Sequence, residues 1–145
     1  MSFADAASTG PQLSTTVDGI RLALHVLAAS IWVGGQFTMA GLLPTARRAG
    51  ADLPQKLARA LAVLLWPAFA VLLITGFWNI SAITLSGQST AWKTVLIIKL
   101  VVVVIAGVGV YLHQRSTTKR SLAVWASVGG LASVAALVMG VFLAG

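Results

Sequence analysis

Hydrophobic residues along the chain gather into four long stretches separated by short polar segments. The stretches cover approximately residues 20–43, 60–83, 93–113 and 121–144. Crossing the hydrocarbon core of a bilayer, about 30 Å thick, takes about 20 helical residues. The pattern therefore predicts an all-α integral membrane protein whose four transmembrane helices form an up-and-down bundle. We expect these helices at about 17–43, 57–83, 92–113 and 120–144, after a short external tail over residues 1–16.

Basic residues are concentrated in two of the three connections between the stretches. The connection after the first holds Arg47, Arg48, Lys56 and Arg59, and the connection after the third holds Arg115, Lys119 and Arg120. The connection over residues 84–91 carries no charge. Because Lys and Arg are retained on the cytoplasmic side of a membrane, both basic connections are expected inside. This prediction places the N-terminus and the C-terminus outside.

Composition excludes a water-soluble domain. The 145 residues are 58% hydrophobic and only 9% charged, so residues 17–145 are expected to form one membrane domain. The net charge of +7 lies mostly beside helix ends, which indicates contact with the lipid bilayer and not with nucleic acid. The chain has no cysteine, which excludes disulfides and thiolate metal sites. We find no soluble-enzyme motif and assign no catalytic residue.

Proline and small residues predict where helices end and where they pack. Pro44 follows the first stretch, so we expect that helix to end near Leu43 and residues 45–55 to be irregular. Pro67 lies inside the second helix and is expected to kink it. On the fourth helix, Gly129 and Ser133 are four residues apart, as are Ala132 and Ala136. Such spacing allows close helix packing, and it leaves open whether the partner is in this chain or in another copy.

Two ionisable residues, His25 and Lys99, fall inside the predicted spans. An ionisable side chain in a bilayer is energetically costly and suggests function. At 1.5 Å per residue, both lie about 8–10 Å below the outer helix ends, and Met139 falls in the same layer. The alternative is that Lys99 snorkels to the outer headgroups and that His25 only satisfies a backbone carbonyl.

The polar and aromatic residues of the first and third helices each follow one stripe. On the first helix the stripe holds His25, Ala29, Trp32, Gln36 and Met39, and on the third it holds Trp92, Lys99, Ala106 and His113. We expect both stripes to face the interior of the bundle. Trp32 and Gln36 are then candidates for contact with a cofactor, or plain packing residues.

His113 lies at the opposite end of the bundle from His25. It is fourteen residues from Lys99, which is about 21 Å along a helix. His25 and His113 are therefore not expected to share one metal ion or one haem iron. A histidine at this position is more often an interfacial residue near a helix C-terminus.

Several segments resemble known membrane protein families. LHVLAASIWVGGQF, with His25, Trp32, Gly34 and Gly35, resembles the first helix of the copper-resistance D family. PAFAVLLITGFW and TAWKTVLIIKLVVVVIAGVGVYLHQR resemble later helices of that family, so the likeness covers about residues 24–115. The pattern is also similar to the membrane-bound, haem-containing protoporphyrinogen oxidases. The resemblance implies a multi-pass protein of the bacterial cytoplasmic membrane that handles copper or a redox cofactor.

Two functional hypotheses follow. In the first, the outer half of the bundle binds haem b or, as an alternative, copper, with His25 as the metal ligand and Trp32, Gln36, Lys99 and Met139 around the cofactor. Haem b is chemically the easier cofactor, because one imidazole suffices and an apolar bundle suits the macrocycle. In the second, the chain is a non-catalytic accessory subunit that packs on a larger membrane complex, or on a second copy, through its fourth helix. The sequence leaves open whether the protein is an enzyme.

Overall fold

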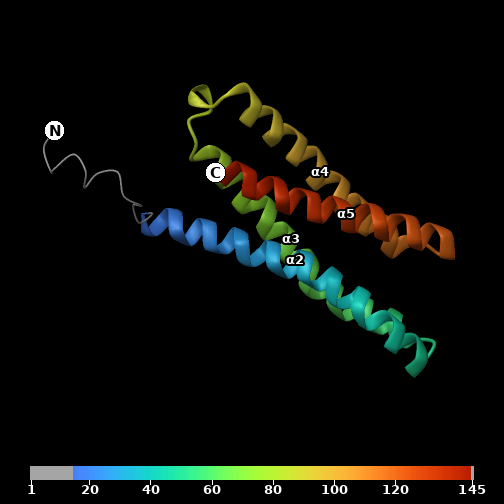
Figure 1. Ribbon diagram of the computed structural model, residues 1–145. Coiled ribbons are helices and arrows are strands. Elements are labelled where there is room, and N and C mark those ends of the chain that lie inside the picture. Colours follow the sequence, from blue (N-terminus) through green and yellow to red (C-terminus); the bar gives the residue numbers. More distant parts are fainter. Residues whose placement is uncertain (1–14, 145) are drawn as a thin grey trace, which may run out of the picture.

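The computed structural model describes residues 15–144, and its regular structure in that range is helical (Figure 1). Its long helices are α2 (Thr16–Ala49), α3 (Leu53–Ser81), α4 (Thr90–Arg115) and α5 (Lys119–Ala144), and a single turn, η1 (Leu85–Gly87), lies between α3 and α4. Each of the four is long and apolar enough to cross a membrane. This confirms the prediction of an all-α protein with four membrane-length helices.

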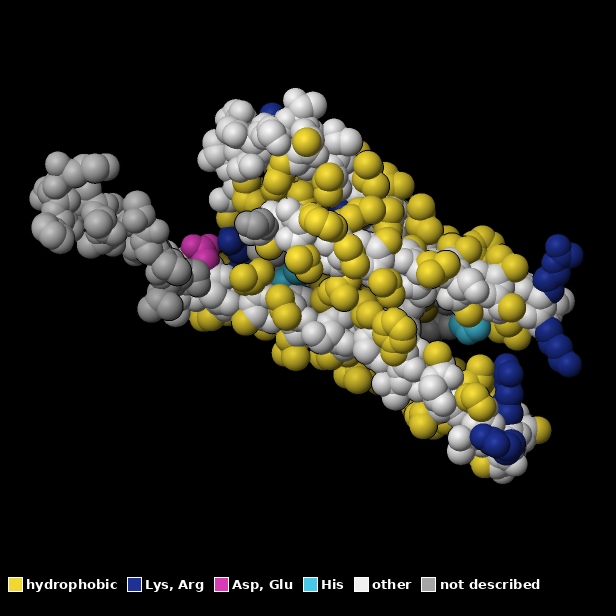
Figure 2. Space-filling view, in the orientation of Figure 1, with side chains coloured by type: hydrophobic (Ala, Val, Ile, Leu, Met, Phe, Trp, Pro, Cys, Tyr) yellow, Lys and Arg dark blue, Asp and Glu magenta, His cyan; other side chains and the backbone are white. Residues whose placement is uncertain are grey.

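The four helices are arranged as two antiparallel hairpins. α2 packs against α3, α4 packs against α5, and the two hairpins meet mainly through α2 and α5 (Figure 1). The hairpins diverge toward their turns, away from the end that holds the start of α2 and the end of α5. Lys and Arg side chains gather at the tips of both diverging hairpins (Figure 2). The basic connections therefore lie at one end of the molecule, as the charge pattern predicts.

Hydroxyl side chains cap the starts of two helices. The Thr15 Oγ1 accepts a hydrogen bond from the Asp18 backbone N–H at 3.3 Å, and the Ser89 Oγ accepts one from Trp92 at 3.2 Å. These bonds satisfy backbone donors that the first turn of a helix leaves unpaired. Helix α2 accordingly begins within one residue of the predicted position, and α4 begins two residues before it.

The predicted end of the first helix at Leu43 is wrong. Helix α2 continues through Pro44 to Ala49, and the connection predicted over residues 45–55 shortens to the few residues between Ala49 and Leu53. Proline removes one backbone hydrogen bond, yet the helix persists because Ala46, one turn from its end, is 3% exposed. Tertiary packing therefore outweighs the local helix-breaking tendency. At 1.5 Å per residue the 34 residues of α2 span about 51 Å, well beyond a bilayer core.

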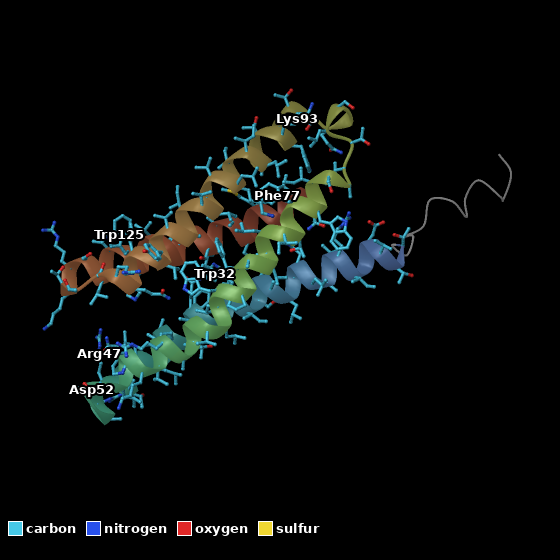
Figure 3. All side chains as sticks on the ribbon, turned by 180° about the vertical axis from the view of Figure 1, so that it is seen from behind. Trp32, Arg47, Asp52, Phe77, Lys93 and Trp125 are labelled. Atoms are coloured by element: carbon cyan, nitrogen blue, oxygen red, sulfur yellow. The ribbon has the colours of Figure 1, made fainter. Side chains whose placement is uncertain are left out.

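Aromatic side chains fill the centre of the molecule, where α2 crosses α3. Trp32 of α2 is 2% exposed, and its ring lies 4.4 Å from that of Phe69 and 5.8 Å from that of Trp66. Figure 3 places Trp32 midway between the tip marked by Arg47 and the opposite end marked by Lys93. This cluster stabilises the first hairpin, and one side of it faces the second hairpin.

The small residues of α5 are used inside this chain. A Cβ atom built on Gly109 of α4 would lie 2.8 Å from the Gly129 Cα, and one built on Gly129 would lie 2.9 Å from the Val110 nitrogen. The backbones of α4 and α5 thus touch at this crossing, which only glycine permits. Of the small residues that the sequence offers to an unspecified partner, Gly129 packs against α4 and Ser133 contacts α2.

Candidate functional site

His25 is held by a hydroxyl of the neighbouring helix. Its Nδ1 lies 2.8 Å from the Oγ1 of Thr75 on α3. The Thr75 hydroxyl is 3% exposed and donates its single proton to the Val71 carbonyl at 2.7 Å. It therefore accepts from His25, so the proton of the neutral ring is on Nδ1 and the lone pair is on Nε2. The half-buried imidazole also lies beside Gly76, where a built Cβ would be 3.6 Å from its Cε1.

Lys99 reaches the same end of the bundle from the second hairpin. Its Nζ would lie 3.1 Å from a Cβ atom built on Gly140 of α5, so the side chain packs over a glycine. Within residues 15–144 Lys99 forms no salt bridge. The two basic side chains thus lie on different hairpins, His25 against α3 and Lys99 against α5, and no hydrogen bond joins them.

Trp32 and Gln36 belong to a polar contact between the hairpins. The Trp32 Nε1 donates to the Ser133 Oγ at 3.0 Å, and the Gln36 Nε2 donates to the same oxygen at 3.1 Å. Ser133 in turn donates to the Gly129 carbonyl at 2.7 Å. Every polar atom of Ser133 is therefore paired, and the contact ties α2 to α5. The packing role that the sequence offers for Trp32 and Gln36 is visible here in full.

Met139 and His113 have different surroundings. Met139 is half-buried on α5, next to the Gly140 that Lys99 covers. His113 lies in the last turn of α4, and its Nδ1 is 2.9 Å from the Leu122 carbonyl of α5. A carbonyl only accepts, so His113 donates this bond and joins the two helices of its hairpin. Its position near the basic tips agrees with the predicted separation from His25.

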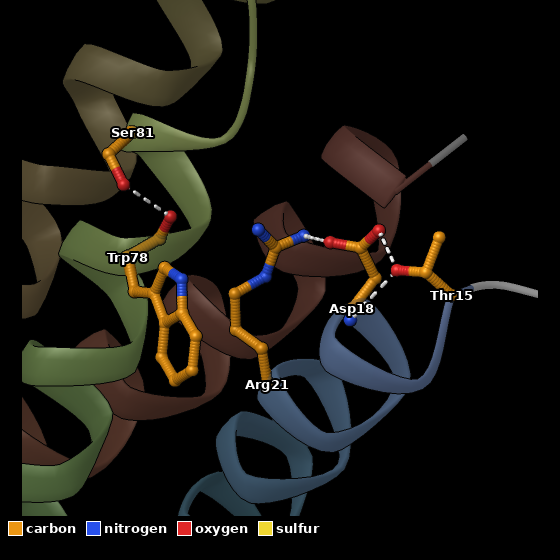
Figure 4. Close-up of polar contacts among 5 residues, drawn as sticks. All are labelled: Thr15, Asp18, Arg21, Trp78 and Ser81. Atoms are coloured by element: carbon orange, nitrogen blue, oxygen red, sulfur yellow. Dashed lines mark hydrogen bonds and ion pairs between the residues drawn. The ribbon is translucent and has the colours of Figure 1, made fainter.

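Arg21 adds a further basic side chain near the start of α2. Its Nη2 lies 3.1 Å from the Asp18 Oδ1, while its Nε is buried without a hydrogen-bond partner. Figure 4 shows the side chain extending between Asp18 and the Trp78 indole of α3. In the part of the chain that the structure describes, this is the only salt bridge.

The donor set determines which cofactors fit. Nowhere in residues 15–144 do three His, Cys, Asp or Glu side chains gather as a metal site. A haem needs only one imidazole from the protein, and His25 with its free Nε2 meets that need. A metal-bound histidine usually donates its other ring N–H to a carboxylate, a backbone carbonyl or water, and the Thr75 hydroxyl would take that place here.

Thr75 is the residue of the candidate site that the sequence pattern does not predict. It lies in an apolar run, where a threonine normally bonds the carbonyl of its own preceding turn. That bond is indeed made, to Val71. The second role, toward a residue fifty positions away, leaves no signal in the local pattern.

Comparison with known proteins does not identify a family for this chain. No protein-family model matches the chain, and no curated protein and no solved structure matches it.

Proposed function

We propose that this protein is an integral membrane haem protein of the copper-resistance D type, which holds haem b in the outer half of its bundle for a redox role. The observation that carries the proposal is the hydrogen bond from His25 to Thr75. That bond leaves the Nε2 lone pair of His25 free, so His25 would be the residue that ligates the haem iron. When bound, the haem would supply one-electron chemistry, while His25 would provide its ligation.

The charge distribution supports the same cofactor. Haem carries two propionates, and carboxylates in a low-dielectric site require cationic or hydrogen-bonding partners. Lys99 forms no salt bridge within residues 15–144 and packs over Gly140 of α5, on the other hairpin from His25. We propose that Lys99 pairs with a propionate. Copper fits less well, because Cu(I) prefers soft sulfur ligands and the chain has no cysteine and only three methionines.

The proposed orientation follows from the basic tips. We propose that Arg47, Arg48, Arg115 and Arg120 face the cytoplasm of a bacterial cell, and that both termini face out, because Lys and Arg are retained inside. The segment between α3 and α4 carries no charge over residues 82–89, which suits the translocated side. His25 and Lys99 would then lie in the outer leaflet.

Absorption spectroscopy with two matched histidine variants tests the proposal. Protein purified in mild detergent from a haem-sufficient host is expected to show a Soret band. His25→Ala should abolish that band, while His113→Ala should leave it largely intact, since His113 Nδ1 is bonded to a carbonyl at the other end of the bundle. Circular dichroism would check that both variants remain helical.

Two results would contradict this reading. If only His113→Ala loses the band, the ligand is His113, at the basic end of the bundle. If the purified protein contains no haem and no copper and shows no visible absorption, the cofactor proposal is wrong. The accessory-subunit hypothesis would then take its place. Metal analysis of the same sample distinguishes haem iron from copper.

A further inference from the structure

An open apolar groove runs between the two hairpins on the side where α3 and α4 face each other. Trp66, Phe69 and Leu73 line it from α3, and Val104, Val108 and Tyr111 line it from α4. Its volume is about 370 Å³. The groove exists because the hairpins meet mainly through α2 and α5, which leaves α3 and α4 apart.

The shape of the groove suits one hydrocarbon chain. Phe69 lies over Gly107 of α4, where a built Cβ would be only 2.7 Å from the ring, so aromatic and glycine surfaces form its floor. From Val104 to Tyr111 is seven residues, about 10 Å along the helix. The groove therefore extends about 10 Å along α4 and has an apolar lining.

One end of the groove is cationic. The Arg115 guanidinium lies 5.3 Å from the centre of the Tyr111 ring, so Tyr111 links the groove to this charge. Arg115 also lines a second, more polar hollow with the hydroxyl residues Thr117 and Thr118 of the α4–α5 turn. Arg115 forms no salt bridge with any residue between 15 and 144.

We propose that the groove binds one anionic phospholipid, with an acyl chain between α3 and α4 and the phosphate at Arg115. Charge complementarity favours this occupant, since basic residues beside a membrane surface attract anionic headgroups. A second copy of the chain lying parallel in the membrane would instead bring its own basic tip against Arg115 (Figure 2). Like charges in that position would oppose association.

Native mass spectrometry of detergent-purified full-length protein, incubated with an equal mixture of phosphatidylglycerol and phosphatidylcholine, tests the proposal. The unmodified protein should retain one phosphatidylglycerol in preference to phosphatidylcholine. Arg115→Gln should reduce that preference about fivefold, the effect of one basic residue near the surface. Arg120→Gln removes the same charge from the same end of the molecule and should leave the preference unchanged.

A second pair of variants tests the apolar part of the site. Val104 is 64% exposed, so Val104→Trp should fill the groove without disturbing the fold and should abolish retention of both lipids. Val141, 70% exposed on α5 and outside the groove, provides the control Val141→Trp, which should retain lipid normally. Equal retention by all four variants would overturn the proposal. A protein dimer that Val104→Trp dissociates would also overturn it, by assigning the groove to a second copy.

Discussion

The contact between α4 and α5 at Gly109 makes the most direct prediction about stability. Gly109→Ala adds one methyl group where the Gly129 Cα and nitrogen each lie only 2.8 Å from the new atom. Ordinary van der Waals contact begins at 3.4 Å, and the obstructing atoms belong to the backbone. The two helices must therefore move apart by about 0.6 Å at their crossing, which loosens every neighbouring contact.

The magnitude follows from two opposing terms. Replacing glycine by alanine inside a helix gains up to about 1 kcal/mol in helix propensity, whereas overpacking a close contact costs about 1–3 kcal/mol. Gly34 of α2 provides the matched control, because a Cβ built there meets nothing within 4 Å. Gly34→Ala should be neutral or stabilising. The difference between the two variants isolates the clash and should be about 1–3 kcal/mol.

Unfolding in mixed micelles of a mild detergent and sodium dodecyl sulfate, followed by tryptophan fluorescence, provides the assay. Gly109→Ala should unfold at a lower dodecyl sulfate fraction than the original protein, and Gly34→Ala at the same or a higher fraction. If the two variants unfold at the same fraction, α4 and α5 do not cross at these glycines. That result would contradict the close contact between the two helices of the second hairpin.

Two further predictions concern single contacts, and a third concerns the topology. Ser133→Ala removes the acceptor shared by two buried donors and should lower the free energy of unfolding by about 1–2 kcal/mol in the same assay; an unchanged value would mean that the contact between the hairpins does not contribute. Thr75→Val removes the partner of the His25 Nδ1 and should weaken haem retention about 10-fold or more. Thr38 provides the control, because its hydroxyl bonds only its own helix, so Thr38→Val should retain haem. Equal loss in both variants would argue against the orienting role of Thr75. For topology, a cysteine at Ser86 should react with an impermeant thiol reagent from outside the cell and one at Thr117 only after lysis, and the reverse pattern would invert the proposed orientation.

The sequence by itself determined the number of membrane-length helices and the end at which charge collects. Both properties are local, because the free energy of placing apolar or charged groups in a bilayer depends on each residue and its depth. The cost of an ionisable side chain in lipid similarly directed attention to His25 and Lys99. The same reasoning failed at Pro44, where a local helix-breaking tendency lost to the packing of Ala46.

The tertiary structure alone decided which residues meet. Thr75 and His25 are fifty residues apart in sequence. They meet only because α2 and α3 cross with a particular rotation of each helix. Likewise, the sequence allows Gly129 to pack against another copy of the chain. In the structure Gly129 packs closely against Gly109 of the same chain. The groove beside Phe69 exists because the hairpins join along α2 and α5. Hydrophobic periodicity defines the apolar face of a helix, but which neighbour covers that face is decided by the complementary shapes of side chains on several helices together.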